Sequence, residues 1–117
     1  MTQLGTTYQR IRGKYYTLTY AATIDIDFAL SLNFQVTLEG NPVLTFSNLG
    51  VANGKIYCVR FIQDATGGRV PTYPATFKPP GDIDPTLSSA ANKIDLLTLR
   101  GDGTNMEQFG FAQTVGG

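Results

Sequence analysis

The carboxylates are the side chains of this sequence best suited to chemistry, and they occur in two close pairs. Asp25 and Asp27 are two residues apart in an alternating stretch, and Asp82 and Asp84 are two residues apart in "GDIDP". Two carboxylates ~5–9 Å apart can hydrolyse a glycosidic bond, and loop carboxylates can bind calcium. A neighbouring pair leaves no cleft between its members, and calcium takes about six or more oxygen ligands. We therefore expect neither catalysis nor a metal at these pairs.

The residue types that the sequence lacks exclude several classes of catalytic and metal site. The sequence contains no histidine and a single cysteine. Without histidine there is no Ser-His-Asp or Cys-His catalysis, and most zinc sites are excluded. Cys58 lies among apolar neighbours in "KIYCVRFI", so we expect a buried, inert thiol. Any catalysis would have to use carboxylates, lysine or tyrosine, and we expect no cofactor.

The segment "QDATGGR", residues 63–69, combines an acid, two glycines and an arginine. As a structural turn, Asp64 accepts backbone N–H groups, Gly67 and Gly68 supply positive φ angles, and Arg69 pairs with Asp64. The alternative is an anion cradle made of successive N–H groups. That cradle would lack the lysine and the following helix of a phosphate-binding loop. We expect the structural turn.

The elements that position these residues are predicted to be strands. Residues 24–38 alternate apolar and polar side chains, which is typical of strand with one buried face, but one strand of that length would be ~50 Å long. We expect a break near residues 29–31. "KIYCVRFI", residues 55–62, is apolar on both faces, which indicates a central strand, and prolines restrict the next segment to short edge strands. "TLSSAANK" is expected to form one helical turn, and "GDGTN" to be the loop of a closing hairpin.

Together these patterns predict an all-β fold, an antiparallel β-sandwich or jelly-roll-like single domain. Residues 1–20 are expected to form an N-terminal arm or edge strand, and residues 21–117 the β-sandwich domain. Lysine plus arginine and aspartate plus glutamate both number 9, so the net charge is zero. This balance argues against a dedicated nucleic-acid binder, and no apolar run is long enough for a membrane helix. The N-terminus has no apolar signal region, so we expect synthesis in a cytoplasm.

A resemblance to a known family rests on several motifs in combination. They are "QDATGGR", "TYPATF", "PTLSSAANKIDLLTL" and "DGTN". In this order, over residues 22–112, they resemble a β-sandwich domain of tailed-bacteriophage virion proteins, often the C-terminal part of tail fibres. The chain departs from the family pattern at Tyr73 and Met106, where tryptophans are expected. These departures would remove aromatic surface that fibre tips use for receptors.

The resemblance implies a non-enzymatic building block of the virion that is usually a homotrimer. Two placements follow, and we expect the first, with the second as the alternative. In the first, the protein is a capsid decoration (cement) protein that binds the major capsid protein and stabilises the shell. In the second, it is a tail-fibre or baseplate module that binds other tail proteins and contacts host glycan through exposed aromatics such as Tyr73 or Phe77. Neither placement involves nucleic acid or a membrane.

Two groups of residues are candidate contacts with partner proteins. "YQRIRGKYY" interleaves basic and aromatic side chains, and we expect it to contact an acidic patch on a neighbouring capsid subunit, or else to be an edge strand with solvated charges. Arg60, a charge in a central strand, is expected either at a subunit interface or at a solvated strand end. The candidate contacts of the first group are Tyr8, Arg10, Arg12, Lys14, Tyr15 and Tyr16.

Overall fold

The computed structural model describes residues 14–116, and these fold almost entirely into strands. The all-β fold class is therefore confirmed. A single turn of 3-10 helix, η1 (Pro80–Asp82), lies between the sixth and seventh strands. Within the described residues, no helix is long and apolar enough to span a bilayer. The strands are β1 (Tyr16–Leu18), β2 (Thr23–Asp27), β3 (Asn33–Leu38), β4 (Val43–Ser47), β5 (Ile56–Gln63), β6 (Phe77–Lys78), β7 (Ile94–Gly101) and β8 (Met106–Gly116).

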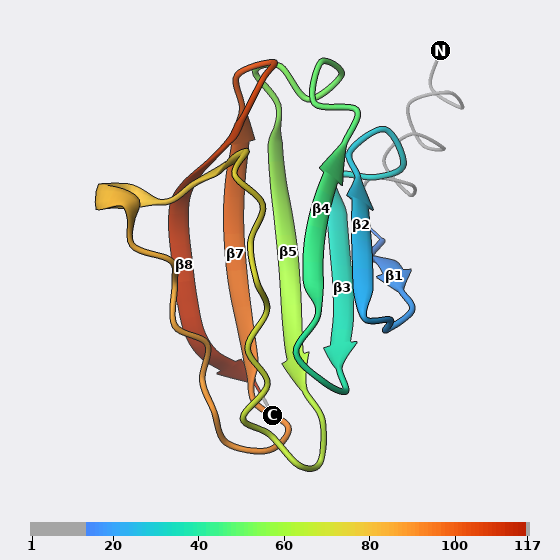
Figure 1. The fold of residues 1–117 in the computed structure, drawn as a ribbon, viewed down its shortest axis with the longest axis vertical. Helices are drawn as coiled ribbons and strands as arrows, with labels where there is room; N and C mark the ends of the chain where they lie inside the picture. The colour runs from blue at the N-terminus through green and yellow to red at the C-terminus, as the bar shows by residue number, and fades with distance from the viewer. Residues whose placement is uncertain (1–13, 117) are drawn as a thin grey trace, which may run out of the picture.

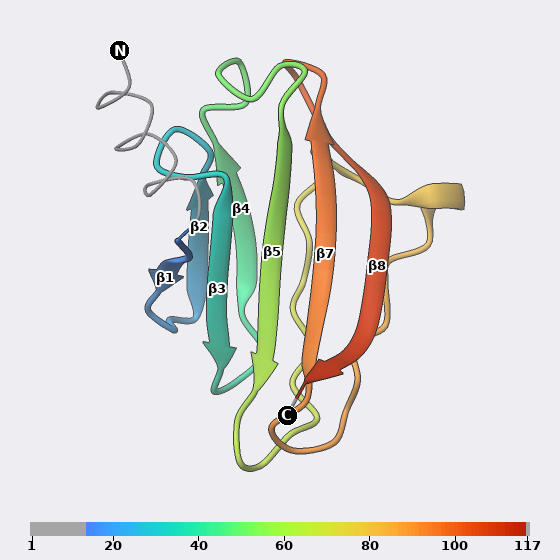
Figure 2. The ribbon, with the colours of Figure 1, turned by 180° about the vertical axis from the view of Figure 1, so that it is seen from behind.

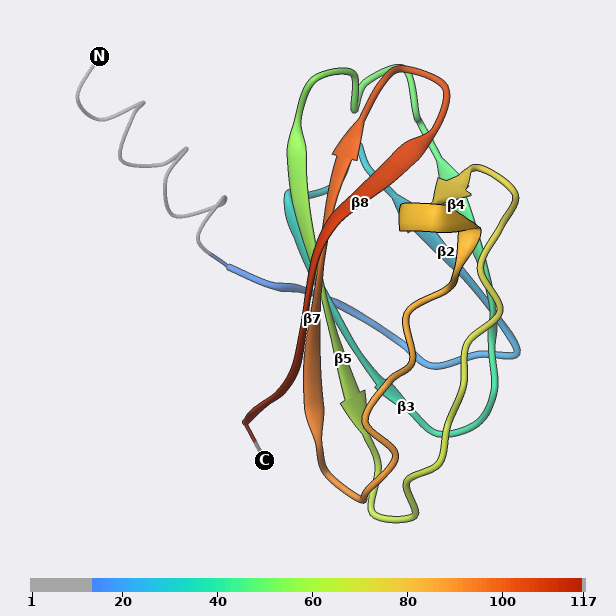
Figure 3. The same cartoon turned by 90° about the vertical axis from the view of Figure 1, so that its left-hand side faces the viewer.

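The strands form two layers, a six-stranded sheet in the order β1-β3-β5-β7-β8-β6 and a two-stranded sheet β2-β4. Figure 3 shows the two layers edge-on, with β2 and β4 on one side and β5, β7 and β8 on the other. The expected antiparallel pairing is wrong for much of the molecule. Only β5–β7 and β7–β8 are antiparallel, whereas β1–β3, β3–β5, β2–β4 and β6–β8 are parallel.

The path of the chain explains the parallel pairs. It also differs from the jelly-roll connection that was expected. From β2 to β5 the chain crosses between the layers after every strand, as Figure 3 shows. Each crossing reverses the direction of the chain, so two strands that share a layer run the same way. Strand β2 therefore pairs with β4, and β3 with β5, instead of each pairing with its neighbour in sequence.

The alternating stretch of residues 24–38 supplies two strands, with the break where it was expected. A turn at residues 28–30 separates β2 from β3, and it is closed by hydrogen bonds from the N–H groups of Ala29 and Leu30 to Asp27. Both strands turn their even-numbered apolar side chains into the space between the layers. Because the period is two on each side of the turn, one continuous pattern fits both strands.

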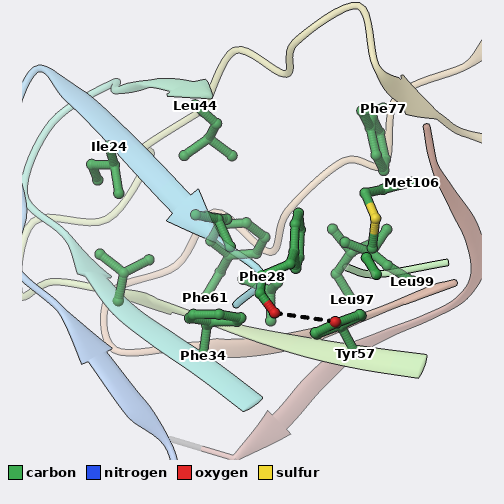
Figure 4. Close-up of a cluster of buried hydrophobic side chains, with 14 of the residues drawn as sticks. Ile24, Phe28, Phe34, Leu44, Tyr57, Phe61, Phe77, Leu97, Leu99 and Met106 are labelled. Carbon is green, nitrogen blue, oxygen red and sulfur yellow. Dashed lines mark hydrogen bonds between the residues drawn. The ribbon is translucent and has the colours of Figure 1, made fainter. Parts of the chain in front are cut away.

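The core lies between the two layers, and Figure 4 shows its main side chains. Phe28 is at its centre, with ring centroids 5.9 Å from Phe34, 5.2 Å from Phe46 and 4.8 Å from Tyr57. Tyr57 is buried and donates a hydrogen bond of 3.1 Å from its hydroxyl to the carbonyl oxygen of Phe28. The turn between β2 and β3 is thus fixed to strand β5 of the other layer.

Strand β5 is central in its sheet, between β3 and β7, as expected, but it is buried on one face only. Tyr57, Val59 and Phe61 point into the core and are fully buried. On the other face, Ile56 is 53% exposed, and the remaining side chains are partly buried. The apolar residues on both faces of this strand therefore do not mean that both faces are covered.

Residues 64–93 contain few strands and cover the part of the core that the two-stranded sheet does not reach (Figure 1). As predicted for this proline-rich segment, its only strand in the large sheet is the two-residue β6 at the edge. The helical turn expected at "TLSSAANK" is wrong, because residues 86–89 have no regular secondary structure and only a bend and a turn follow at residues 90–92. The hairpin expected around "GDGTN" is confirmed and joins β7 to β8.

Candidate functional site

The "QDATGGR" loop follows β5 and is held by its own side chains. Asp64 accepts hydrogen bonds from the N–H groups of Thr66 and Gly67, at 3.1 and 3.0 Å. Its other oxygen forms an ion pair with Arg69 at 3.0 Å. Gly67 and Gly68 have φ angles of 74° and 71°. The N–H groups that would cradle an anion thus already bind a carboxylate of the same loop.

The same loop is joined to the segment that precedes β7. The side-chain amide of Gln63 donates to the carbonyl of Arg69 and accepts from its N–H, at 2.9 and 3.0 Å. The N–H of Gly68 donates to the carbonyl of Ser89 at 2.7 Å. The N–H of Asn92 donates to the carbonyl of Asp64 at 3.0 Å. Two motifs that are separate in the sequence therefore form one pair of loops joined by hydrogen bonds.

A buried carboxylate that the sequence did not single out extends this network to β8. Asp95 is 2% exposed and lies on β7. It accepts hydrogen bonds from the N–H and hydroxyl of Ser88, at 2.6 and 2.8 Å, and from the N–H of Thr114 at 2.8 Å. Asp95 could have been identified from the sequence, because it is an aspartate at a position of β7 whose alternate neighbours, Leu97 and Leu99, are apolar and buried.

Acid should weaken the fold because several aspartates are stabilised in their charged form. The hydrogen bonds from Arg69 and from the N–H of Gly67 lower the pKa of Asp64, and backbone N–H groups of Asn105 and Thr104 lower the pKa of Asp102. A carboxyl whose folded-state pKa is depressed stabilises the fold above its unfolded pKa of about 4, and this contribution is lost as pH falls through the folded-state value. We expect the melting temperature to be flat above pH ~5 and to fall below pH ~4.

Thermal melts followed by circular dichroism across this pH range measure the effect. Asp64→Asn cannot ionise at this position and should show a smaller acid-dependent fall than the wild type. An equal fall in both proteins would contradict the role given to Asp64.

The acidic pairs of the sequence lie on different parts of the surface. Asp25, on the outer face of β2, accepts hydrogen bonds from the hydroxyls of Thr45 and Ser47 at 2.8 and 2.6 Å. Asp82 and Asp84 lie in and just after η1, on the irregular segment. Among the described residues, no three of the potential ligands histidine, cysteine, aspartate and glutamate come together in a way that could hold a metal ion. The carboxylates of β2 instead accept hydrogen bonds from side chains of β4 and of the residue that follows it.

Cys58 lies on the outer face of β5 and is only partly buried, which corrects the expectation of a buried thiol. Burial nevertheless raises the pKa of this thiol, which outweighs the opposing effect of the nearby Arg60 charge. Since the thiolate is the nucleophile, a raised pKa makes the sulfur less reactive.

Arg60 occupies the middle of the outer face of the six-stranded sheet, not a strand end. It donates a hydrogen bond of 2.8 Å to the side-chain oxygen of Gln35 on β3. Gln35 in turn donates to the hydroxyl of Thr17 on β1 at 2.9 Å. The guanidinium lies 5.4 Å from the ring centroid of Tyr15. The structure therefore brings together two sets of candidate contacts, the tyrosines near the N-terminus and Arg60.

The same region contains a shallow hollow of about 190 Å³. Lys14, Tyr15 and Tyr16 line it together with Leu30 and Ser31. The candidate contacts Tyr8, Arg10 and Arg12 lie outside the residues that the structure describes.

The comparisons with known proteins identify one family. A family model described as "Putative phage tail fibre C-terminal domain" matches residues 14–106. The chain belongs to this tail-fibre family. Searches of curated proteins and of solved structures give no match. The membership confirms the resemblance to phage virion proteins and makes the chain a virion-associated structural domain.

Within this tail-fibre domain, the positions where tryptophans were expected belong to the core. Met106 is fully buried, and Tyr73 packs against the core with its ring stacked on Phe77, centroids 4.5 Å apart. Phe77 is itself buried. Tyr73 and Phe77 are therefore not exposed loop aromatics, and the expectation that they contact a receptor is wrong. The two departures from the family pattern therefore lie in the core or against it.

Proposed function

We propose that this chain is a non-enzymatic structural module of a phage tail fibre, which assembles as a homotrimer and contacts other proteins of the virion. The family match over residues 14–106 is the observation that carries this proposal. A module of this kind works by presenting a rigid surface at many symmetric positions, so its effect comes from repeated contacts.

The geometry of the described residues supports a binding role over a catalytic one. The carboxylates of Asp64 and Asp95 accept hydrogen bonds from backbone N–H groups, so they stabilise the loops around them. The exposed tyrosines, Tyr15 and Tyr16, line the hollow, and Tyr15 also lies over Arg60. They are the aromatic surface that a host glycan would meet if the module also binds a receptor.

Capsid decoration is the second candidate within the same class of virion structural proteins. A broad, partly apolar sheet face favours contact with a protein, and it would serve a trimer seated on the shell as well as one in a fibre. In that case the partner would be the major capsid protein, and the protein would stabilise the shell by bridging subunit joints.

The copy number in purified particles separates the two candidates. We expect quantitative mass spectrometry to find far fewer copies than of the major capsid protein, in step with known tail components. A fixed, near-stoichiometric ratio to the capsid protein would instead support decoration. Absence of the protein from purified particles would overturn both proposals.

A further inference from the structure

The loop between β4 and β5 contains the one asparagine of this sequence that a glycine follows, Asn53 before Gly54. In such a pair the backbone nitrogen of the glycine can reach the side-chain amide carbon of the asparagine, because glycine has no Cβ atom to hinder the approach. Every other asparagine of the chain precedes a residue with a side chain. Asn53 and Gly54 are also exposed, so water has access to both. The loop therefore has the composition and the exposure that deamidation requires.

The β7–β8 hairpin holds both reacting groups in place. The N–H of Gly54 donates a hydrogen bond of 2.7 Å to the carbonyl oxygen of Gly101, and Asn53 forms an isolated parallel bridge with the same residue. The side chain of Asn53 lies against the hairpin loop, since a Cβ atom on Gly103 would be 3.4 Å from its Cγ atom. Figure 2 shows the β4–β5 loop and this hairpin side by side at the top of the molecule. The nitrogen of Gly54 must give up its hydrogen bond to Gly101 before it can lose its proton and react.

We propose that Asn53 is a deamidation site and that its contact with the β7–β8 hairpin controls the rate. Hydroxide takes the proton of the Gly54 N–H, and the nitrogen forms a bond to Cγ of Asn53. The bond between Cγ and Nδ2 breaks, and Nδ2 leaves as ammonia after it takes a proton from water. Water then opens the cyclic imide at either carbonyl carbon, which gives aspartate or isoaspartate. The only reactants are the chain and water, so the reaction does not depend on the proposed function.

The loop has little room for isoaspartate, in which the backbone runs through the former side-chain carbon and is longer by one atom. Ala52, directly before Asn53, is fully buried in the core. A Cβ atom on Gly101 would overlap the carbonyl group of Ala52, so the two backbones are already in close contact. We therefore expect isoaspartate at this position to displace Ala52 from the core or to break the bridge with Gly101, and so to lower the melting temperature.

The test is the rate of deamidation at each asparagine of the full chain, measured by peptide mapping with mass spectrometry. The wild type is incubated in mildly alkaline buffer, with and without concentrated urea. In urea we expect Asn53 to react faster than every other asparagine. Without urea its rate should be at least ~10-fold lower, because only the fraction of molecules with this loop open can react.

Two matched variants test whether the hairpin controls the rate. Asp102→Ala removes the carboxylate that accepts hydrogen bonds from the N–H groups of Thr104 and Asn105 within the hairpin loop, at 2.9 and 2.6 Å. Asp64→Ala removes a carboxylate with the same role in the loop at the other end of β5. We expect Asp102→Ala to raise the rate at Asn53 in native buffer at least ~3-fold, and Asp64→Ala to leave it unchanged.

Circular dichroism checks that both variants are folded, and the wild-type rates with and without urea decide the result if Asp102→Ala does not fold. Equal wild-type rates in the two conditions would overturn the proposal. So would an Asn53 that reacts no faster in urea than the other asparagines, or equal rates at Asn53 in the two folded variants.

Asn53→Asp is the control for the effect on stability, because it carries the charge of the aspartate product on an unchanged backbone. We expect this variant to melt close to the wild type, and wild-type protein aged until Asn53 is mostly isoaspartate to melt at a lower temperature. An aged sample that melts like Asn53→Asp would overturn the effect on stability that the close packing of Ala52 and Gly101 predicts.

Discussion

Phe28→Ala is expected to lower the free energy of unfolding by about 3–5 kcal/mol. Phe28 is 2% exposed, and its ring contacts Phe34, Phe46 and Tyr57, which come from both layers. Removing the ring leaves a cavity where the layers meet, at the turn that connects β2 to β3. A domain of this size is stable by only ~5–15 kcal/mol, so the variant should lose a large share of its stability. Urea unfolding followed by circular dichroism measures the change.

Tyr57→Phe is the matched control for this prediction. It keeps the ring that packs on Phe28 and removes the hydroxyl that donates to the carbonyl oxygen of Phe28. Its expected cost is about 1 kcal/mol, because one buried carbonyl loses its partner. If the two variants were equally destabilised, the packing of the Phe28 ring would not be the main contribution at this position.

Gly67→Ala is expected to destabilise the protein much more than Gly68→Ala, although the two glycines have nearly the same backbone conformation. Both have φ near +70°, which costs an alanine ~1–2 kcal/mol. A Cβ atom on Gly67 would lie 2.5 Å from the carbonyl oxygen of Ser89 and 2.8 Å from the nitrogen of Ala91, whereas a Cβ atom on Gly68 meets nothing within 4 Å. The clash should add a further ~1–3 kcal/mol.

Thermal and urea unfolding of the two alanine variants give the difference directly. The backbone strain is common to both variants, so the difference isolates the close approach of the "QDATGGR" loop to the segment before β7. Equal stabilities would mean that this segment moves aside without cost.

Much of the fold follows from local patterns in the sequence. The alternation in residues 24–38 locates β2 and β3, and the length of the pattern requires the turn at residues 28–30. The residues "GDGTN" locate the β7–β8 hairpin. The alternation does not indicate which strands pair with one another in the sheets. Alternation fixes which face of a strand is buried, but parallel and antiparallel neighbours satisfy it equally well.

The missed elements have a similar cause. "TLSSAANK" has helix-capping residues, but Asp95 binds the N–H of Ser88 and Gly68 binds the carbonyl of Ser89. These tertiary hydrogen bonds use the backbone groups of Ser88 and Ser89 that a helical turn would need. The contacts within "QDATGGR" could be predicted because Asp64 and Arg69 are close in sequence. The contact between Tyr15 and Arg60 could not, because it depends on the order of strands in the sheet.

The pairing of each strand with the next but one affects how fast the chain can reach its native state. Of the strand pairs, only β7 and β8 are neighbours in sequence and joined by a short hairpin. Every other pair requires an intervening strand to be placed in the opposite layer or a long segment to be closed first. Each of these closures costs chain entropy before the stabilising contacts between the strands can form. We therefore expect the domain to fold slowly for its size. Exposed strand edges then persist during biosynthesis, and a host chaperone or early assembly would protect the nascent protein from aggregation.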